Sequence, residues 1–409
     1  MLDLPQLLQN FDQVKLTPVY LSHLPLGIPA VPHDTGPQPA ARYTFGVKDL
    51  GNLDWGLFLA RPRLPSPSLE VLDTLYRQSM LVTGAGGSVG SALVLRLGAV
   101  GPSLLLALDS AESRLYKLQL DWAAHGIPGA FTNILGNVSD RTLLDEVFTV
   151  RQPRIVFHTA AFKSVALLEQ QPLAAIQNNV FGTLTLTQAA AAHGARMVLV
   201  STSKAVEPCS IMGVTKRLSE QIVLAHGGVV LRNGNVLGTR DSVTETFAAQ
   251  IARGRALTVT DPAARRCFLT LDEAVNLLLI AAAEKDIPAL MAPELPPAQF
   301  VSDLARFMAA RLDPGTAHEI DFIGARPGDK QEERLWSSLE SPRPALHPGL
   351  LTIRTEVPSI ADLERNLEQL RDAVNARDLV SAVEQLRAIV PEYSPSHSVR
   401  TMAEQRSAS

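Results

Sequence analysis

The chain has 409 residues, a hydrophobic content of 46% and a formal net charge of −4. This length allows one large α/β domain with appendages or two domains, and the composition suffices for a full core. The sequence has no long basic run and no apolar run long enough to span a bilayer, so we expect neither nucleic acid as a partner nor a membrane span. Two cysteines cannot form a disulfide framework, which favours a reducing, cytoplasmic compartment.

Prolines interrupt any long periodicity in the first 65 or so residues. This stretch is predicted to be an arm that packs on the main domain, with partial disorder as the alternative, and residues 2–11 could form a short helix. A helix is predicted over residues 69–76, just before the first strand. The arm as a whole is taken as residues 1–76.

Residues 80–93 read MLVTGAGGSVGSAL. A short apolar run is followed by Gly84, Gly87 and Gly90 and then by a helical pattern, which predicts a strand, a tight turn and a helix. Glycines in such a turn let a pyrophosphate approach the helix N-terminus, where unpaired N–H groups favour an anion. Asp109 ends the next apolar run, where a Rossmann fold places the carboxylate that binds the adenosine ribose.

Apolar runs and helical patterns then alternate regularly. Strands are predicted at 80–83, 103–108, 131–135, 155–158, 197–201 and 228–232, and helices near 88–99, 112–125, 140–149, 166–193 and 212–226. Continuously apolar strands between helices indicate a parallel sheet covered on both faces. The predicted fold is therefore an α/β, Rossmann-type doubly wound parallel sheet, over residues 77–232, with ligands at the carboxyl ends of its strands.

The rest of the chain is less regular. Helices are predicted at 243–252, 271–283 and 300–311, with a strand at 257–260. Residues 233–358 are expected to form a smaller, mixed substrate lobe interleaved with the Rossmann domain. Leucines at helical spacing predict a helical hairpin over 359–395, and residues 396–409 are expected to be a disordered tail.

Several blocks of sequence, taken together, carry a family resemblance. These blocks are residues 83–93, 108–118, 157–183, 201–208 (STSKAVEP), 212–220 (MGVTKRLSE), 232–243 (RNGNVLGTRDSV) and 326–330 (RPGDK). Their order and spacing resemble those of the extended short-chain dehydrogenase/reductases, and among these the UDP-N-acetylglucosamine 4,6-dehydratases of polysaccharide biosynthesis.

The resemblance implies a reaction on a UDP-sugar that uses tightly bound NAD or NADP. The cofactor would remove hydride from C4, the ketone would acidify the C5 proton, water would leave from C6, and the hydride would return to C6. Asp109 favours NAD, whereas Ser110 and Arg114 could accommodate the phosphate of NADP.

The same resemblance assigns roles to the catalytic positions. Lys216 would bind the nicotinamide ribose, Thr202 would hydrogen-bond the C4 hydroxyl, and Lys204 would be the base for the C5 proton. Met212 stands where most relatives have a tyrosine base, as it does in one branch of the dehydratases. Ser203 occupies the position of the aspartate that protonates the departing C6 hydroxyl, and a serine hydroxyl is far too weak an acid for that role.

Three hypotheses follow from this departure. The protein could be a 4,6-dehydratase in which another group supplies the proton, and Asp241 is a candidate unless it is simply a solvated loop carboxylate. It could be a 4-epimerase or 4-oxidoreductase that stops at C4 chemistry. It could also be a non-catalytic nucleotide-sugar binding protein on a decayed enzyme scaffold.

The remaining predictions concern binding groups and assembly. The predicted cofactor-binding residues are Gly84, Gly87, Ser88, Val89, Gly90, Asp109, Ser110, Arg114, Asn137, Val138, Ala160, Ala161, Lys163 and Lys216. The predicted substrate-binding residues are Lys163, Asn235, Arg240, Asp241, Ser242, Val243, Arg266 and Arg326. No metal is expected. The helices at 166–193 and 212–226 resemble a dimer-forming pair in this superfamily, and an internal packing role explains their alanine-rich faces equally well. A homo-oligomer is expected.

Overall fold

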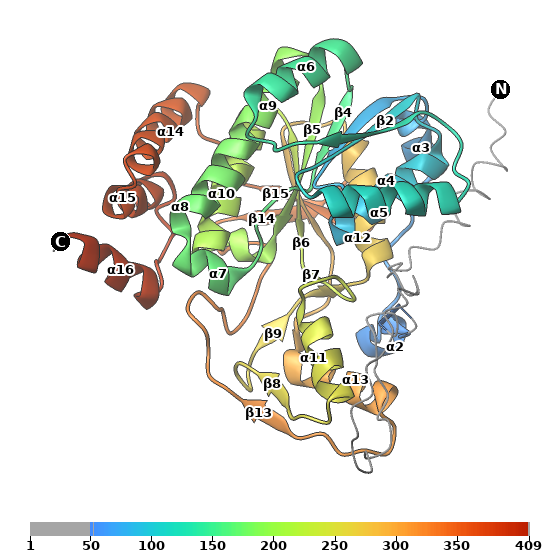
Figure 1. The fold of residues 1–409 in the computed structure, drawn as a ribbon, viewed down its shortest axis with the longest axis vertical. Coiled ribbons are helices and arrows are strands. Elements are labelled where there is room, and N and C mark those ends of the chain that lie inside the picture. Colours follow the sequence, from blue (N-terminus) through green and yellow to red (C-terminus); the bar gives the residue numbers. More distant parts are fainter. Residues whose placement is uncertain (1–49, 52, 408–409) are drawn as a thin grey trace, which may run out of the picture.

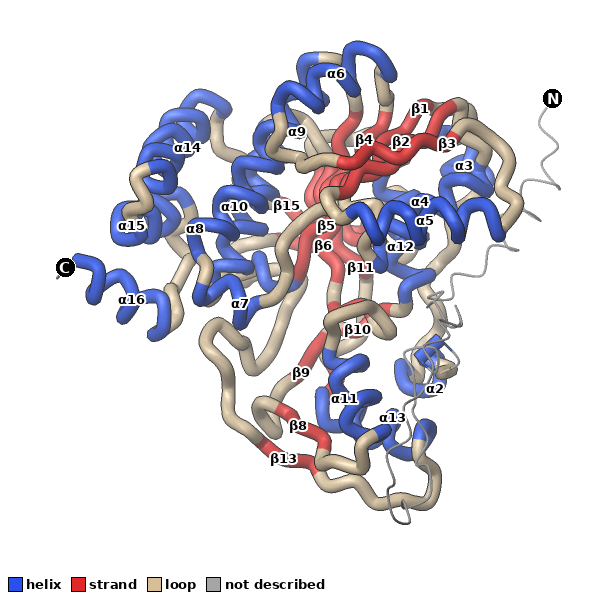
Figure 2. Tube along the Cα trace, in the orientation of Figure 1, coloured by secondary structure: helices blue, strands red, loops and turns tan. Residues whose placement is uncertain are grey.

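A nine-stranded sheet forms the centre of the part of the chain that the structure describes, with helices on both faces (Figures 1 and 2). The structure is a computed structural model and describes residues 50–51 and 53–407. The strand order is β14-β15-β11-β6-β5-β4-β1-β2-β3. The helix predicted at residues 2–11 and most of the predicted arm lie outside the described residues.

Six parallel strands confirm the predicted strand pattern. They are β1 (Ser79–Thr83), β2 (Leu104–Asp109), β3 (Phe131–Leu135), β4 (Ile155–His158), β5 (Arg196–Thr202) and β6 (Val229–Asn233). Their carboxyl ends lie along one edge of the sheet, because neighbouring strands run parallel in register. The fold is therefore the α/β, Rossmann-type sheet that the alternation of strands and helices predicted.

Three further strands extend the sheet beyond β6 and were not predicted. They are β11 (Ala289–Pro293), parallel to β6, then β15 (Leu350–Arg354), antiparallel to β11, and β14 (Ser341–Pro344), antiparallel to β15. The outermost strand has the sequence SPRP and is exposed along its length. Two prolines are tolerated there because an edge strand pairs on one side only. A search for apolar runs in the sequence therefore does not find this strand.

Helices cover the two faces of the sheet with separate apolar cores. One face is covered by α3 (Leu69–Leu75), α4 (Ser88–Val100), α5 (Glu112–Ala124) and α12 (Leu271–Ala282). The other is covered by α6 (Arg141–Arg151), α9 (Gly182–Ala192) and α10 (Ile211–Ala225). Burial of apolar side chains on both faces explains why the central strands are apolar throughout.

The single helix predicted over 166–193 is instead broken into pieces. It consists of α7 (Val165–Gln170), α8 (Pro172–Ala175), the π-helical η2 (Ile176–Phe181) and α9. Gln171, with φ −130° and ψ 55°, interrupts the helix because the residue before a proline disfavours the helical conformation. The break turns α7 towards the carboxyl edge of the sheet.

A smaller lobe lies at that carboxyl edge. It contains α11 (Val243–Ala252), α13 (Val301–Leu312), β8 (Leu257–Val259), β13 (Ile320–Phe322) and the short strands β7 (Asn235–Val236), β9 (Arg265–Arg266), β10 (Phe268–Leu269) and β12 (Gln299–Phe300). An N-terminal helix, α2 (Trp55–Leu59), contributes Phe58 and Leu59 to the core of this lobe. A bidentate ion pair from Arg61 to Glu273, with distances of 2.7 and 2.9 Å, ties the segment after α2 to α12.

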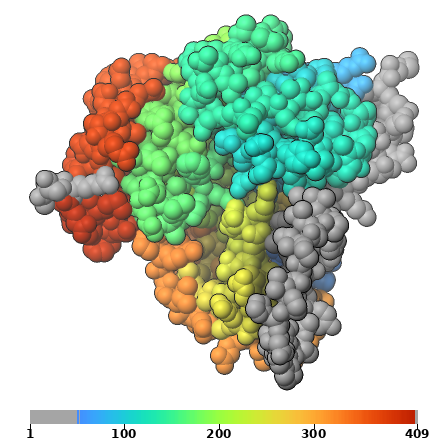
Figure 3. All heavy atoms as spheres, in the orientation of Figure 1, coloured from blue at the N-terminus to red at the C-terminus, as the bar shows by residue number. Residues whose placement is uncertain are grey.

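The C-terminal helices cover the face that was expected to form an oligomer. Helices α14 (Ile360–Asn375) and α15 (Leu379–Ile389) pack against η2, α8 and α10, and Figure 3 shows them in direct contact with the helices of the Rossmann domain. Residues expected to be a disordered tail form α16 (His397–Ser407) instead, because Val399 and Met402 join the same apolar cluster. The chain's own hairpin therefore packs on helices that were expected to pair in a dimer, and a homo-oligomer stays a prediction.

A buried ion-pair network joins α10 to the sheet. Arg232 on β6 is fully buried and lies 2.8 Å from Glu220 and 2.7 Å from Glu340. Replacing Arg232 with methionine leaves two carboxylates without this cation, so we expect the free energy of unfolding to fall by about 3–5 kcal/mol. Urea unfolding measures this loss. Arg141→Met, which removes an exposed ion pair to Asp145, is the control and should cost under about 1 kcal/mol; equal losses in both variants would contradict the prediction.

No helix in the described part of the chain combines the length and the apolarity needed to cross a membrane.

Candidate active site

The glycine turn after β1 is closely packed. Gly84 has φ +67°, and a Cβ atom on it would lie 2.6 Å from the backbone nitrogen of Ala160. A Cβ on Gly90, in the first turn of α4, would lie 2.1 Å from the carbonyl oxygen of Gly84. Only glycine fits at these two positions, so the turn brings the N-terminus of α4 to the carboxyl edge of the sheet.

A cavity of about 890 Å³ opens at this turn. It is lined by every residue predicted to bind the cofactor except Lys216, including the glycines of the turn and the loops that follow β2, β3 and β4. Asp109 is held at its edge, because its carboxylate accepts hydrogen bonds from the backbone N–H groups of Gly86 and Ala111, both at 2.9 Å. The cavity has the position and lining that a dinucleotide requires.

A substitution at the turn tests this assignment. Gly90→Val places a side chain against the Gly84 carbonyl, so we expect NAD affinity to fall by about tenfold or more. Calorimetric titration of the full chain with NAD and NADP measures the loss. Ser91→Ala, the next residue of the same helix, should bind as the unchanged chain does. Undiminished binding by the valine variant would place the cofactor elsewhere.

The end of β5 places Thr202, Ser203 and Lys204 beside a buried glutamate. Lys204 Nζ lies 2.8 Å from Glu333 Oε1, and Ser203 Oγ donates a hydrogen bond of 2.5 Å to Glu333 Oε2. Lys204 Nζ also donates to Asn235 Oδ1 at 3.3 Å. The Thr202 hydroxyl accepts from the backbone N–H of Lys204, which starts the short 3₁₀ turn that aims the lysine. Residues from the end of β5, the start of β7 and the loop that holds Glu333 therefore meet here.

Glu333 is the residue of this candidate site that the sequence did not predict. Burial by itself would raise the pKa of Glu333, but the charges of Lys204 and Arg266 and the hydrogen bonds from Lys204 and Ser203 hold it below its usual value. The carboxylate is therefore ionised near neutral pH and can only accept hydrogen bonds. Its one sequence signal is its place just after the RPGDK block, which does not reveal its partner.

Lys216 lies one helical turn after Met212 on α10 and is almost completely buried. Burial lowers the pKa of Lys216 from 10.5 to about 8, against the opposing charge of Glu220. Burial, with a smaller contribution from Lys216, lowers the pKa of His158 at the end of β4 to about 3, so this imidazole is neutral. It bonds to the hydroxyls of Thr83 and Thr183 at 2.7 and 3.0 Å. Met212 belongs to the apolar cluster under the C-terminal hairpin.

The loop after β7 lies on the cofactor side of the site. The backbone N–H of Arg240 donates to Ser88 Oγ at 3.1 Å, and its guanidinium donates to the carbonyl of Gly86. Lys163 Nζ donates to the carbonyl oxygen of Arg240 at 2.5 Å. Asp241, at φ +55°, is part of the cavity lining. Asp241 thus lies on the cofactor side, and its role as a proton donor stays a prediction.

The remaining predicted substrate residues are divided between two places. Arg266 Nε lies 2.9 Å from Glu333 Oε1, and its Nη1 donates to the backbone carbonyls of Arg265 and Gln331. Arg326 is exposed and pairs with Asp329 at 2.9 Å. The Ser242 hydroxyl donates to the Thr239 carbonyl, and Val243 begins α11. The structure therefore brings Asn235 and Arg266 to Lys204, and places Arg326 on the surface.

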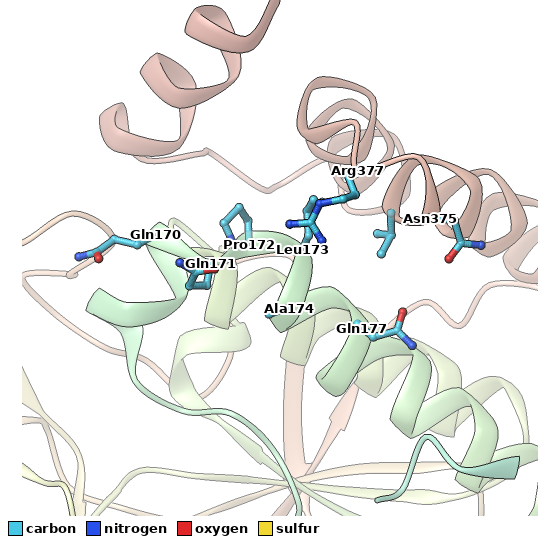
Figure 4. A pocket seen from close by; sticks show the side chains of 9 residues that line it. Gln170, Gln171, Pro172, Leu173, Ala174, Gln177, Asn375 and Arg377 are labelled. Atoms are coloured by element: carbon cyan, nitrogen blue, oxygen red, sulfur yellow. The ribbon is translucent and has the colours of Figure 1, made fainter.

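A separate hollow of about 560 Å³ lies between α8 and the C-terminal hairpin. Figure 4 shows amide side chains and Arg377 around it. Its lining contains no carboxylate, lysine or hydroxyl side chain, so the acid–base groups described above are not found there. Among the described residues, no group of three or more His, Cys, Asp or Glu side chains is placed to hold a metal ion.

Comparison with solved structures supports the fold. The X-ray structure of Pen from Bacillus thuringiensis matches with a TM-score of 0.62 and 24% identity, over 70% of this chain and 89% of that one. The structure of MoeE5 in complex with UDP-glucuronic acid and NAD matches with a TM-score of 0.52 and 26% identity, over 62% of this chain and 88% of that one.

Comparison with curated proteins supports the family. The chain is 34% identical to the probable polysaccharide biosynthesis protein EpsC of Bacillus subtilis and 33% identical to the capsular polysaccharide biosynthesis protein CapD of Staphylococcus aureus, over 69% and 67% of its own length. It spans about half of these relatives, 49% and 47%. It is also 32% identical to the UDP-glucose 4-epimerase of Rickettsia canadensis, over 64% of this chain and 78% of that one.

A family model described as "Polysaccharide biosynthesis protein" matches residues 80–355, which include the sheet, the cavity and the Lys204–Glu333 cluster. The chain therefore belongs to the polysaccharide biosynthesis protein family, whose fold here is that of the extended short-chain dehydrogenase/reductases.

Proposed function

We propose that this protein is an NAD(P)-dependent enzyme that oxidises C4 of a UDP-sugar of the UDP-N-acetylglucosamine type and then eliminates water across C5 and C6. The observation that carries the proposal is a cavity of about 890 Å³, lined by the predicted cofactor-binding loops and by Lys163, at the same edge of the sheet as Lys204 at the end of β5. Relatives named as polysaccharide biosynthesis proteins and as UDP-glucose 4-epimerases support a nucleotide sugar as substrate.

The residues present fit a nicotinamide dinucleotide. The cradle at Gly84 and Gly90 has no room for a Cβ atom, which is expected where a pyrophosphate approaches the backbone. Asp109 would bind the adenosine ribose, and the loop from Ala160 to Lys163 would line the nicotinamide side. When bound, such a group supplies reversible hydride transfer with the sugar C4.

The chain's own groups would hold the sugar and move its protons. The Thr202 hydroxyl would hydrogen-bond the C4 hydroxyl, and Lys204 would take the C5 proton, which a neighbouring ketone makes acidic. Lys216, with a pKa of about 8, would be mostly protonated at neutral pH and would place a positive charge next to the nicotinamide ribose. Met212 has no titratable group, so it would contribute shape and apolar contact only.

A 4-epimerase or 4-oxidoreductase is the second candidate. Two observations favour it: Ser203 replaces the acid that the family resemblance implies, and Glu333 is ionised, so neither offers a ready proton for the C6 oxygen. An enzyme of this kind would use the same cavity and the same C4 chemistry.

Product analysis separates the two candidates. We incubate the full chain with UDP-N-acetylglucosamine and NAD and analyse the sugar by mass spectrometry and NMR. The proposed function predicts a 4-keto-6-deoxy product that has lost one molecule of water. A C4-inverted sugar that keeps its C6 oxygen would favour the second candidate, and an unchanged sugar with a cofactor-loaded protein would refute both.

A further inference from the structure

Elimination of water from C6 needs a proton on the departing oxygen. In this chain the position implied for the acid holds Ser203, whose side chain is fully buried, and its hydroxyl already donates to Glu333. Glu333 is itself only 2% exposed. Neither side chain presents a surface on which a sugar could lie.

Lys204 is more exposed than the glutamate with which it pairs. Its side chain is 23% exposed, whereas that of Glu333 is 1% exposed. A protonated lysine has three N–H donors. Glu333 and Asn235 accept from Nζ at 2.8 and 3.3 Å, both from the protein side, so a third N–H can point at a ligand.

We propose that Lys204 performs both proton transfers of the elimination, and that Glu333 is the positioning residue that makes this possible. The proposal rests on the proposed function, because it needs a 4-keto sugar with an acidic C5 proton. Ser203 is then an anchor for the Glu333 carboxylate and not a proton donor to the sugar.

The step balances without a second acid. Lys204 first releases its third proton to solvent, and Nζ, as the free amine, then takes the proton from C5. The electron pair left behind forms the C5–C6 double bond as the C6–O bond breaks. The leaving oxygen takes one proton from the same ammonium and departs as water. Nζ returns to the free amine, and Glu333 remains a carboxylate throughout.

Glu333 contributes through position and charge. Its two oxygens are held by Ser203 on one side and by Lys204 and Arg266 on the other, so its place does not depend on the sugar. A fixed carboxylate 2.8 Å from Nζ stabilises the ammonium that forms when C5 loses its proton. It also keeps Nζ at one point from which C5 and the C6 oxygen could both be reached.

Three variants of the full chain test the proposal with UDP-N-acetylglucosamine as the probe. Glu333→Gln should lower kcat for dehydration by about 100-fold with little change in KM, and should move the pH–rate profile to lower pH. Glu333→Asp keeps a carboxylate and should restore part of kcat and the original profile. Glu332→Gln, at the exposed neighbouring glutamate, is the matched control and should behave as the unchanged chain.

Ser203→Ala is the decisive fourth variant, because it is a small change that the fold should tolerate. If Lys204 supplies both proton steps, dehydration should persist within about tenfold, since only one hydrogen bond to Glu333 is lost. Loss of dehydration in Ser203→Ala with normal rates in Glu333→Gln would overturn the proposal and assign the acid to Ser203. If the pH–rate profile of Glu333→Gln equals that of the unchanged chain, Glu333 has only a structural role and the proposal is wrong.

A readout that needs no turnover separates this proposal from the proposed function. Competitive acetylation of the full chain, followed by mass spectrometry, reports how strongly each lysine holds its proton. Lys204 should react at least about tenfold faster in Glu333→Gln than in the unchanged chain at pH 8. If the chain dehydrates no sugar, the proposed function fails; if Lys204 reacts equally in both proteins, the assignment to Glu333 fails.

Discussion

Replacing Lys216 with methionine is expected to abolish C4 oxidation and, at the same time, to stabilise the cofactor-free chain. The lysine is almost fully buried, and burial lowers its pKa from 10.5 to about 8. This shift corresponds to a cost of about 3 kcal/mol for keeping the ammonium in the folded chain at neutral pH. Methionine is close to lysine in length and carries no charge, so it removes that cost.

The lowered pKa of Lys216 also determines how this residue's contribution to stability changes with pH. Below pH 8 Lys216 is protonated in both the folded and the unfolded chain, and the cost is fully present. Between about pH 8 and 10.5 the unfolded chain binds the proton more strongly, so the stability due to this group rises with pH. Denaturant unfolding of the cofactor-free protein at pH 7 and pH 9.5 measures this rise, which Lys216→Met should lack.

Lys285→Met is the control for both measurements, because Lys285 is 71% exposed and pairs with Glu70 at 3.6 Å. It should change neither the activity nor the slope of stability with pH. A Lys216→Met protein that is less stable than the parent and still oxidises C4 would show that the lysine is a structural group with no part in the chemistry.

Replacing Lys204 with methionine is expected to lower the rate of dehydration by about 100-fold or more. The variant lacks the amine that would accept the C5 proton in the transition state. The variant should still bind NAD, since Lys204 does not line the cofactor cavity. Single-turnover mass spectrometry of the sugar and calorimetric titration with NAD measure the two effects separately.

This experiment requires that the buried Glu333 carboxylate keep enough partners in the Lys204→Met variant for the chain to fold. Arg266 Nε and Ser203 Oγ still contact the carboxylate at 2.9 and 2.5 Å, so the cluster retains one cation and one donor. Dehydration at the parent rate in a folded Lys204→Met protein would show that Lys204 takes no part in the proton transfers.

Periodicity in the sequence was sufficient to predict the parallel core of the fold. The strands β1, β2, β4, β5 and β6 are largely apolar because both of their faces are buried, and that pattern is visible without coordinates. The edge strand β14 could not be found this way, because its exposed SPRP sequence has no apolar pattern. The prediction of one long helix over 166–193 was wrong, because Pro172 interrupts the helix at Gln171.

The candidate site was predictable only where its residues are close in sequence. The turn from Gly84 to Gly90 and the run from Thr202 to Lys204 are local motifs, and the structure places both at the carboxyl edge. The bond from Ser203 to Glu333 joins positions 130 residues apart. No local pattern encodes such a contact, since it arises from folding of the small lobe onto the sheet.

The sequence also does not show which segment of the chain covers an apolar helix face. The helices around η2 and α10 have an apolar surface, and Leu363, Leu367 and Leu370 of α14 pack on it. An apolar helix face predicts that something packs on it and does not identify the partner.

Transfer of the C4 hydrogen tests the central claim most directly. The full chain, loaded with NAD, is incubated with UDP-N-acetylglucosamine that carries deuterium at C4, and the product is analysed by NMR. The account predicts a 4-keto-6-deoxy sugar with the deuterium at C6. Deuterium that remains at C4 of a sugar with its original configuration and its C6 oxygen would contradict it.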